Sequence, residues 1–400
     1  MGAAAAAAAA GGSAPRANAE TLEVRPGQVA GDSVTAATAL PLLLSITPET
    51  GAKNVSPGKE IVVAVQGGTL GEVTVTSGSS TIEGALGEDG FWRSTEDLAY
   101  GKSYEVVASA TDAGGATVEK TSTFSTVTPE ALAKVTFRAN MLTELKKGKT
   151  YGAGQPVIVA FSRAVNKKAA EKAIEITTSP KVEGKFYWAD SKTVHWRPAK
   201  YWAKGTVIKV KVNGLGAKLG DGVYGAKNAS TEFTIGRQLI AISDSRTHMT
   251  KVYIDGKLVR SMKSSLGKGG GTTGANGQYI NYWTASGPHV VLAIERTHTM
   301  SSASYGVTDP SNPNYYGAEV VQYCTRITYS GEFLHAAPWN GSLGSANLSH
   351  GCVNLSTSDA KWVYENFMLG DVVDVKHTPR ELPIWNGLGD WTVSYDKYGA

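Results

Sequence analysis

The sequence predicts a mostly β protein built from several domains. Its 400 residues are enough for two to four domains. Its 46 glycines and short β-branched runs are typical of strands joined by turns, and few stretches have the apolar spacing of a long helix. We therefore expect small β modules in series, with one short helix close to the C-terminal end.

Residues 1–42 are predicted to form a flexible low-complexity tether, because alanine, glycine, serine and threonine cannot bury a core. Met1 and Gly2 are followed by eight alanines, without the basic and large apolar residues of a signal peptide. No stretch reaches the length of a transmembrane helix. We expect the mature form of an exported protein, and leave open a lipid anchor or membrane tether in a longer form.

Residues 43–127 and 128–236 are predicted to form two similar immunoglobulin-like β-sandwiches. Short strands with turns every 8–12 residues are typical of that fold. Neither module contains a cysteine, so the antibody disulfide is absent. We expect one tryptophan in each module to belong to its core rather than to a ligand platform. The matching segments are Ile61–Val65 with Val157–Phe161, Trp92 with Trp196, and Phe124 with Phe233.

The net charge of +4 conceals an asymmetry. Residues 1–133 hold 7 basic and 15 acidic residues, residues 134–236 hold 19 and 7, and residues 237–400 hold 13 of each. The lysines of the middle module suit an anionic polymer, such as a cell-wall glycan, a teichoic-type chain or nucleic acid. A solvated lysine-rich surface is the interpretation we favour.

Residues 237–376 are predicted to form a third, β-rich domain, and residues 377–400 an extension that packs on it. Residues 267–277 are rich in glycine but lack the Gly-Lys-Ser/Thr order of a phosphate-binding loop, so we expect a mobile turn there. The other local predictions are a hairpin at Asp255-Gly256, a turn-rich segment without regular structure at 300–316, a half-buried strand at 321–329, a helix over 358–367 capped by Ser358, and a closing strand at 372–375.

The hexapeptide Ser349–Asn354 (Ser-His-Gly-Cys-Val-Asn) places one of only two cysteines in a turn of small residues. His350 lies two residues before Cys352, and His335 lies fourteen residues before Ser349. A thiol needs a base to become a nucleophile at neutral pH. The amides of Gly351 and Cys352 would then point at a developing oxyanion. The spacing indicates a cysteine acyl-transfer site.

His335 followed by this hexapeptide resembles the signature of the L,D-transpeptidases, cysteine enzymes that cross-link bacterial peptidoglycan. The segments Ser330–Trp339 and Gly387–Trp391 are similar to the mycobacterial and actinobacterial branch. The resemblance covers residues 237–400 strongly, and the N-terminal half by architecture only. It implies two immunoglobulin-like modules ahead of an L,D-transpeptidase catalytic domain, located in the cell envelope outside the cytoplasmic membrane.

The resemblance also implies roles for individual residues. Cys352 is the expected nucleophile and His335 its general base and acid, with the ring held by the backbone carbonyl of Ala336, where relatives often have serine. His350 stays open as an alternative base. Gly351 and Cys352 supply the oxyanion hole, assisted by the Tyr305 hydroxyl. The residues expected to line the cleft are Met300, Tyr305 and Tyr316 on a flap, and Ser330, Gly331, Trp339 and Asn354 in the donor pocket. A plain surface loop in place of the flap stays open, as does the choice between Tyr315 and Tyr316.

The implied reaction cleaves a tetrapeptide stem between its third-position diamino acid and D-Ala, and joins it to the side-chain amine of a second stem as a 3→3 cross-link. The expected partners are peptidoglycan stems and carbapenems that acylate the cysteine, with no cofactor, metal or nucleic acid. The alternatives are an L,D-carboxypeptidase and a non-catalytic wall-binding protein. A metal site from His335, His350, Cys352 and Cys324 fits no common zinc spacing. We expect both cysteines to be free, because a disulfide would consume the nucleophile.

Overall fold

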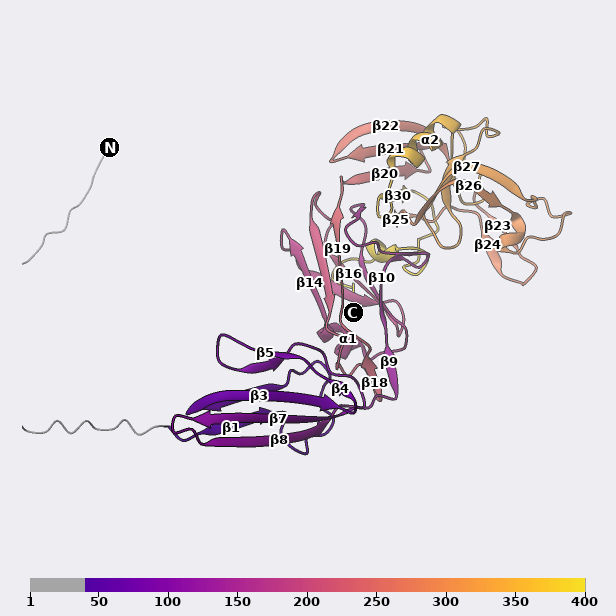
Figure 1. Cartoon of the computed structure of the whole chain (residues 1–400). Coiled ribbons are helices and arrows are strands. Elements are labelled where there is room, and N and C mark those ends of the chain that lie inside the picture. The colour runs from indigo at the N-terminus through magenta and orange to yellow at the C-terminus, as the bar shows by residue number, and fades with distance from the viewer. Residues whose placement is uncertain (1–39, 400) are drawn as a thin grey trace, which may run out of the picture. The chain divides into compact units, whose positions relative to one another are not determined.

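The computed structural model describes residues 40–399 (Figure 1). The predicted tether, 1–42, therefore lies almost entirely outside the described residues. Within residues 40–399, none of the helices is long and apolar enough to span a lipid bilayer. Strands dominate the described chain and follow one another in three groups, so the mostly β fold class is confirmed.

The first sandwich consists of two four-stranded sheets, ordered β1-β2-β6-β5 and β4-β3-β7-β8. Its core contains the apolar residues of the inward-facing strand positions, among them Ile61, Val63 and Phe124. Its strands are β1 (Leu43–Thr47), β2 (Val62–Gln66), β3 (Gly68–Ser77), β4 (Ser80–Thr81), β5 (Gly84–Leu86), β6 (Trp92–Ser94), β7 (Ser103–Asp112) and β8 (Thr117–Ser125).

The second sandwich has a five-stranded sheet, β11-β10-β13-β16-β15, and a four-stranded sheet, β12-β19-β17-β14, with a short β18-β9 pair. Its elements are β9 (Ala131–Ala133), β10 (Val135–Asn140), β11 (Thr143–Glu144), β12 (Thr150–Tyr151), β13 (Val157–Phe161), α1 (Lys167–Ala173), β14 (Ile174–Ser179), β15 (Gly184–Trp188), β16 (Thr193–Pro198), β17 (Val207–Val212), β18 (Val223–Gly225) and β19 (Ala229–Ile235).

The two sandwiches share one packing device. Trp92 and Trp196 are each 8% exposed, which confirms that both belong to the cores. Each indole lies over a glycine of the neighbouring strand: a Cβ at Gly84 would lie 2.1 Å from Trp92 Cζ2, and one at Gly184 would lie 2.3 Å from Trp196 Cζ2. Only glycine leaves room for a ring at that distance.

Gly184→Ala is expected to destabilise the second sandwich by about 1–3 kcal/mol, because the new methyl group must displace Trp196 from a close-packed core. The measurement is thermal or denaturant unfolding followed by tryptophan fluorescence. Gly220→Ala is the matched control in the same sandwich, because a Cβ there meets Val223 at an ordinary 3.5 Å. Equal unfolding midpoints for the two variants would contradict the prediction.

The third domain is built on a nine-stranded sheet, β25-β30-β20-β21-β22-β29-β28-β27-β26, with a separate β23-β24 hairpin. Its elements are β20 (Leu239–Asp244), β21 (Met249–Ile254), β22 (Lys257–Ser265), β23 (Gly271–Thr273), β24 (Tyr279–Asn281), β25 (Gly287–Val290), β26 (Ala293–Met300), η1 (Ser302–Tyr305), β27 (Glu319–Arg326), β28 (Phe333–Ala336), β29 (Val353–Leu355), α2 (Thr357–Asn366), β30 (Val372–Lys376) and η2 (Gly389–Thr392).

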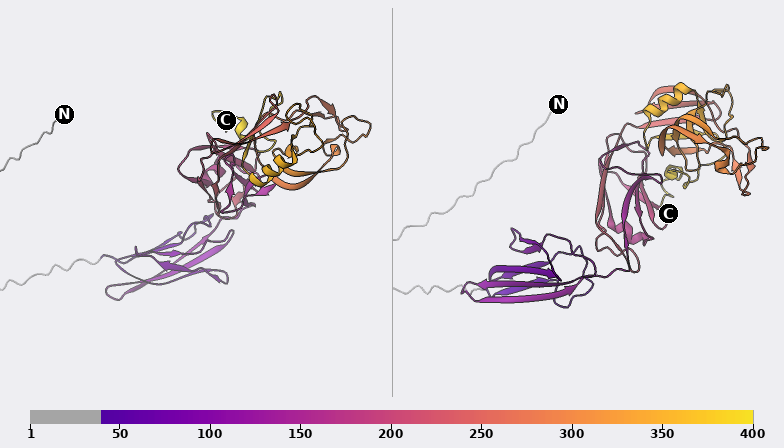
Figure 2. Two further views of the ribbon diagram at one scale, coloured as in Figure 1. Left: turned by 90° about the horizontal axis from the view of Figure 1, so that it is seen from above. Right: turned by 45° about the vertical axis from the view of Figure 1, so that its right-hand side comes forward.

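Helix α2 packs on β27 and β28 (Figure 1 and Figure 2) and buries Ala360 and Val363 in the core of this domain. The expected cap, Ser358, is wrong: Ser356 Oγ accepts the Asp359 amide at 3.1 Å and begins the helix. Ser356 Oγ also donates to the Asp359 carboxylate at 2.8 Å. Both contacts join the Ser356 hydroxyl to Asp359, three positions later, and identify Ser356 as the N-cap.

The C-terminal segment (377–399) contacts the third domain and the second sandwich. Toward the third domain, the Leu382 amide donates to Ser286 O at 2.9 Å. Toward the second sandwich, Asp390 Oδ1 lies 2.9 Å from His195 Nδ1, and Trp391 Nε1 donates to Gly154 O at 2.7 Å. The sequence pointed only to the third domain as its support.

Candidate active site

The cysteine turn (349–352) directly precedes β29 and is closed by a serine. Ser349 Oγ donates to Cys352 O at 2.6 Å and accepts the Gly351 amide at 3.1 Å. Gly351 has a φ of +133°, which favours glycine. The expectation for Gly351 is corrected, since its N–H is already occupied by Ser349. The Cys352 N–H has no hydrogen-bond partner within residues 40–399 and stays a candidate oxyanion donor.

Residue Cys352 is half-buried, and its thiol faces Gly331 O at 3.8 Å. Burial raises the pKa of the thiol to about 12, the Phe333 amide opposes that rise, and the Glu332 carboxylate adds to it. The thiol is therefore protonated at neutral pH. A base must remove its proton during the reaction.

His335 is the better placed base. It lies on β28, which pairs in parallel with β29, and His335 stands opposite Asn354 of β29. Side chains two residues apart share one face of a strand, so the His335 ring and the Cys352 sulfur face the same side of the sheet. His335 Nδ1–H donates to Ala336 O at 2.8 Å. Burial lowers the pKa of His335 to about 4, so Nε2 carries a lone pair at neutral pH.

Asn354 holds the other side of the His335 ring. Its Nδ2 lies 2.9 Å from His335 Nε2, and its Oδ1 accepts from Asn340 at 3.1 Å, which fixes the orientation of the amide. No hydrogen bond between His335 and Cys352 occurs in the described part of the chain. Transfer of the thiol proton therefore requires Nε2 to exchange Asn354 for the sulfur.

His350, the alternative base, points toward other partners. Its Nε2 lies 3.2 Å from Lys268 Nζ, and its ring centroid lies 4.8 Å from that of Tyr282 and 5.6 Å from that of Tyr316. Burial, and then the Lys268 charge, lower the pKa of His350 to about 4. The charged ammonium of Lys268 therefore engages the lone pair that His350 would use as a base, whereas the His335 lone pair meets only the neutral Asn354 amide, which favours His335.

A cavity of about 730 Å³ opens above the sulfur. Eleven of the twelve predicted site residues line it; the twelfth, Ala336, takes part through its carbonyl. Tyr316 lines the cavity and Tyr315 does not. The cavity also brings Trp339 beside the base, with its ring centroid 6.2 Å from that of His335.

The segment over the cavity contains the short helix η1, so the expectation that residues 300–316 lack regular structure is wrong for Ser302–Tyr305. Ser302 Oγ donates to Tyr316 O at 2.9 Å and ties the segment together. The Tyr305 hydroxyl is buried close to the Tyr316 hydroxyl and makes no hydrogen bond of normal geometry among residues 40–399. Burial raises the pKa of Tyr305, so the phenol keeps a proton to donate.

Both cysteines are free, as predicted. Cys324 is fully buried, and its thiol lies 3.6 Å from Val321 O. Burial raises the pKa of Cys324 to about 12, so Cys324 is a structural thiol. Within the described chain, no group of three or more His, Cys, Asp or Glu side chains is arranged to hold a metal ion.

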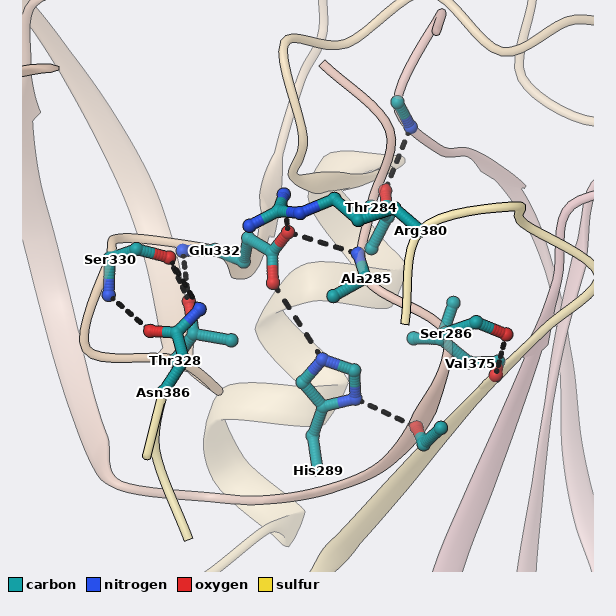
Figure 3. Close-up of polar contacts among 12 residues, drawn as sticks. Thr284, Ala285, Ser286, His289, Thr328, Ser330, Glu332, Val375, Arg380 and Asn386 are labelled. Carbon is teal, nitrogen blue, oxygen red and sulfur yellow. Dashed lines mark hydrogen bonds and ion pairs between the residues drawn. The ribbon is translucent and has the colours of Figure 1, made fainter. Parts of the chain in front are cut away.

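Sequence reasoning missed a polar group behind the cavity, shown in Figure 3. Ser330, a predicted substrate contact, forms two hydrogen bonds with Asn386. The Ser330 backbone N–H donates to Asn386 Oδ1, and the Ser330 hydroxyl accepts from Asn386 Nδ2, both at 2.9 Å. Glu332 and Arg380 also line the cavity and form an ion pair. Glu332 could have been suspected from the sequence, because it stands only three residues before His335. Arg380 and Asn386 are distant in the sequence, and only the fold brings them to the cavity.

Comparison with known proteins gives two family matches: a bacterial Ig domain over residues 52–218, and an L,D-transpeptidase catalytic domain over residues 237–375. The chain is 39% identical over 355 residues to L,D-transpeptidase 2 of Mycobacterium tuberculosis, covering 88% of this chain and 82% of that protein. It is 31% identical over 364 residues to L,D-transpeptidase 5 of the same species, covering 89% and 76%. A solved structure of the LD transpeptidase LdtMt1 with imipenem covers 60% of this chain and 99% of that chain, at 29% identity and a TM-score of 0.49.

Proposed function

The chain belongs to the L,D-transpeptidase family, and we propose that Cys352 is the nucleophile with which it cleaves and transfers peptidoglycan stem peptides. The observation that carries the proposal is the His335 ring, held with an unprotonated Nε2 on the face of the sheet where Cys352 lies. The donor is a tetrapeptide stem that occupies the cavity.

In the first half-reaction the Cys352 sulfur attacks the carbonyl carbon of the diamino acid while His335 Nε2 takes the thiol proton. The developing oxyanion is stabilised by the Cys352 N–H and the Tyr305 hydroxyl, neither of which makes a hydrogen bond of normal geometry among residues 40–399. His335 then returns the proton to the leaving nitrogen, and D-Ala departs to leave a thioester.

In the second half-reaction the side-chain amine of a second stem attacks the thioester carbonyl. His335 accepts a proton from the attacking nitrogen and returns it to the sulfur, which restores the thiol. The product is a 3→3 cross-link. We propose that this takes place in the cell envelope of an exported protein, and that carbapenems acylate the same sulfur. No step requires a cofactor.

The proposal is tested by incubating the protein with a disaccharide-tetrapeptide and separating the products by mass spectrometry. Cross-linked dimers with release of D-Ala are expected. Tripeptide alone would identify an L,D-carboxypeptidase, in which water resolves the thioester. Unchanged tetrapeptide would contradict both enzymatic functions and favour a wall-binding protein.

Tyr305→Phe is expected to slow acylation of Cys352 about 10²-fold, because it removes one oxyanion donor without changing the shape of the segment over the cavity. The measurement is the rate at which an added carbapenem acylates the protein. Tyr315→Phe is the matched control, since Tyr315 does not line the cavity. Equal rates in the two variants would exclude the Tyr305 hydroxyl from the oxyanion hole.

A further inference from the structure

A buried ion pair lies directly behind the cysteine turn. Glu332 is 4% exposed, and its Oε1 accepts from Arg380 Nη1 at 2.9 Å and from the Ala285 amide at 3.0 Å. Its Oε2 lies 3.6 Å from Nε2 of the fully buried His289, which faces Gly287 O through Nδ1 (Figure 3). One carboxylate thus joins the strand β25, the loop before it and the C-terminal segment.

The backbone on either side of Glu332 cradles the sulfur. Gly331 provides the carbonyl that faces the Cys352 thiol, and the Phe333 amide interacts favourably with the thiolate. The Glu332 side chain lies next to the cysteine turn, because a Cβ built on Gly351 would meet Glu332 Cγ and Oε1 at 3.8 Å. The carboxylate is therefore close to the turn that holds the sulfur.

Arg380 supplies the positive charge of the pair from outside the nine-stranded sheet. It follows β30 in the C-terminal segment, and its Nη1 also donates to Trp283 O at 2.9 Å. The same segment contributes Asn386, which holds Ser330, and Asp390, which is anchored on His195 of the second sandwich. The position of the guanidinium thus depends on parts of the chain that carry no reacting group.

We propose that the Glu332–Arg380 ion pair positions and tunes the nucleophile: Arg380 holds Glu332 under the cysteine turn and neutralises its charge beside the Cys352 sulfur. Glu332 and Arg380 are positioning residues, since neither takes part in bond making. The inference rests on the proposed function only in taking Cys352 as the nucleophile.

The charges around the sulfur predict in which direction each substitution changes the ionisation of the Cys352 thiol. A carboxylate beside a thiol opposes its ionisation, whereas a guanidinium that pairs with the carboxylate relieves that opposition. The other titratable or charged groups that face the sulfur or the pair are Arg326 and Cys324 on β27, His335 on β28, His350 with Lys268, Tyr305 and Tyr316 over the cavity, and His289 on β25.

The test measures the rate at which iodoacetamide alkylates Cys352 at pH 8, because only the thiolate reacts and the rate far below the thiol pKa is proportional to the thiolate fraction. Modification is located by peptide mass spectrometry, with the buried Cys324 as internal reference. Arg380→Gln is expected to slow alkylation about tenfold, and Glu332→Gln to accelerate it about tenfold. The double variant is expected between the two, and Arg380→Lys, which keeps the charge, at the wild-type rate.

With a merely structural ion pair, the two single variants would change the alkylation rate in the same direction. Rates that stay unchanged, or that change the same way in both single variants, would overturn the proposal. Thermal unfolding checks that each variant is folded; should Arg380→Gln fail to fold, an unchanged or lowered rate in Glu332→Gln overturns the proposal alone. The readout is independent of cross-linking, so wild-type protein that makes no dimers would refute the proposed function while leaving this test intact.

Discussion

Cys352→Ala is expected to lose all covalent reaction with a carbapenem and all release of D-Ala from a tetrapeptide stem. The physical reason is that only a sulfur with a nearby base and free oxyanion donors can form the acyl-enzyme. Whole-protein mass spectrometry after carbapenem treatment gives the result directly. A single adduct on the wild-type protein and none on the variant is the expected outcome.

Cys324→Ala is the matched control for this experiment, since Cys324 is the other free cysteine and is fully buried. It is expected to keep the adduct. An adduct that persists in Cys352→Ala, or that disappears in Cys324→Ala, would show that the wrong sulfur has been assigned.

His335→Gln is expected to slow acylation of Cys352 by about 10³-fold, because general-base assistance is lost while the amide side chain preserves the bulk at a buried position. His350→Gln is the matched control and is expected to stay within tenfold of wild type, since Lys268 engages the His350 ring. A larger loss in His350→Gln than in His335→Gln would reverse the assignment of the base.

The pH dependence of the acylation rate provides a second test of His335 as the base of Cys352. His335 must be unprotonated to accept the thiol proton, and its pKa is lowered to about 4 by burial. The wild-type acylation rate is therefore expected to fall as the pH decreases through about 4, where Nε2 takes up a proton. This fall in rate at low pH is expected to be absent in His335→Gln. If it persists in that variant, another group is titrating.

Local pattern was enough for the architecture of the β modules. Short strands with turns every 8–12 residues predicted two sandwiches, Trp92 and Trp196 were assigned to their cores, and the structure has both. The helix near the C-terminal end was also predictable, although its cap was not, because Ser356 and Ser358 are both acceptable caps until the position of Asp359 is considered. Neighbouring residues decide such features.

The hydrogen-bond partners of the candidate site residues could not be predicted from the sequence. Whether the Gly351 amide is free depends on the rotamer of Ser349 in the folded turn. Whether His350 can act as a base depends on Lys268, which is 82 positions away and reaches it only across the cavity. Such hydrogen bonds leave no periodic trace in the sequence.

By itself the sequence determined the β class and the order of the modules, and it placed Cys352 as the candidate nucleophile with His335 or His350 as its candidate base. Strand alternation and a short motif are properties of neighbouring residues, so they can be identified without the fold. Only the tertiary structure decided that Lys268 engages the His350 ring and Asn354 the His335 ring. It also decided that Ser349 occupies the Gly351 amide, and that Arg380 from the C-terminal segment pairs with Glu332. The order of strands in a sheet brings such groups together from distant parts of the chain, and the energy of each contact depends on burial that exists only after folding.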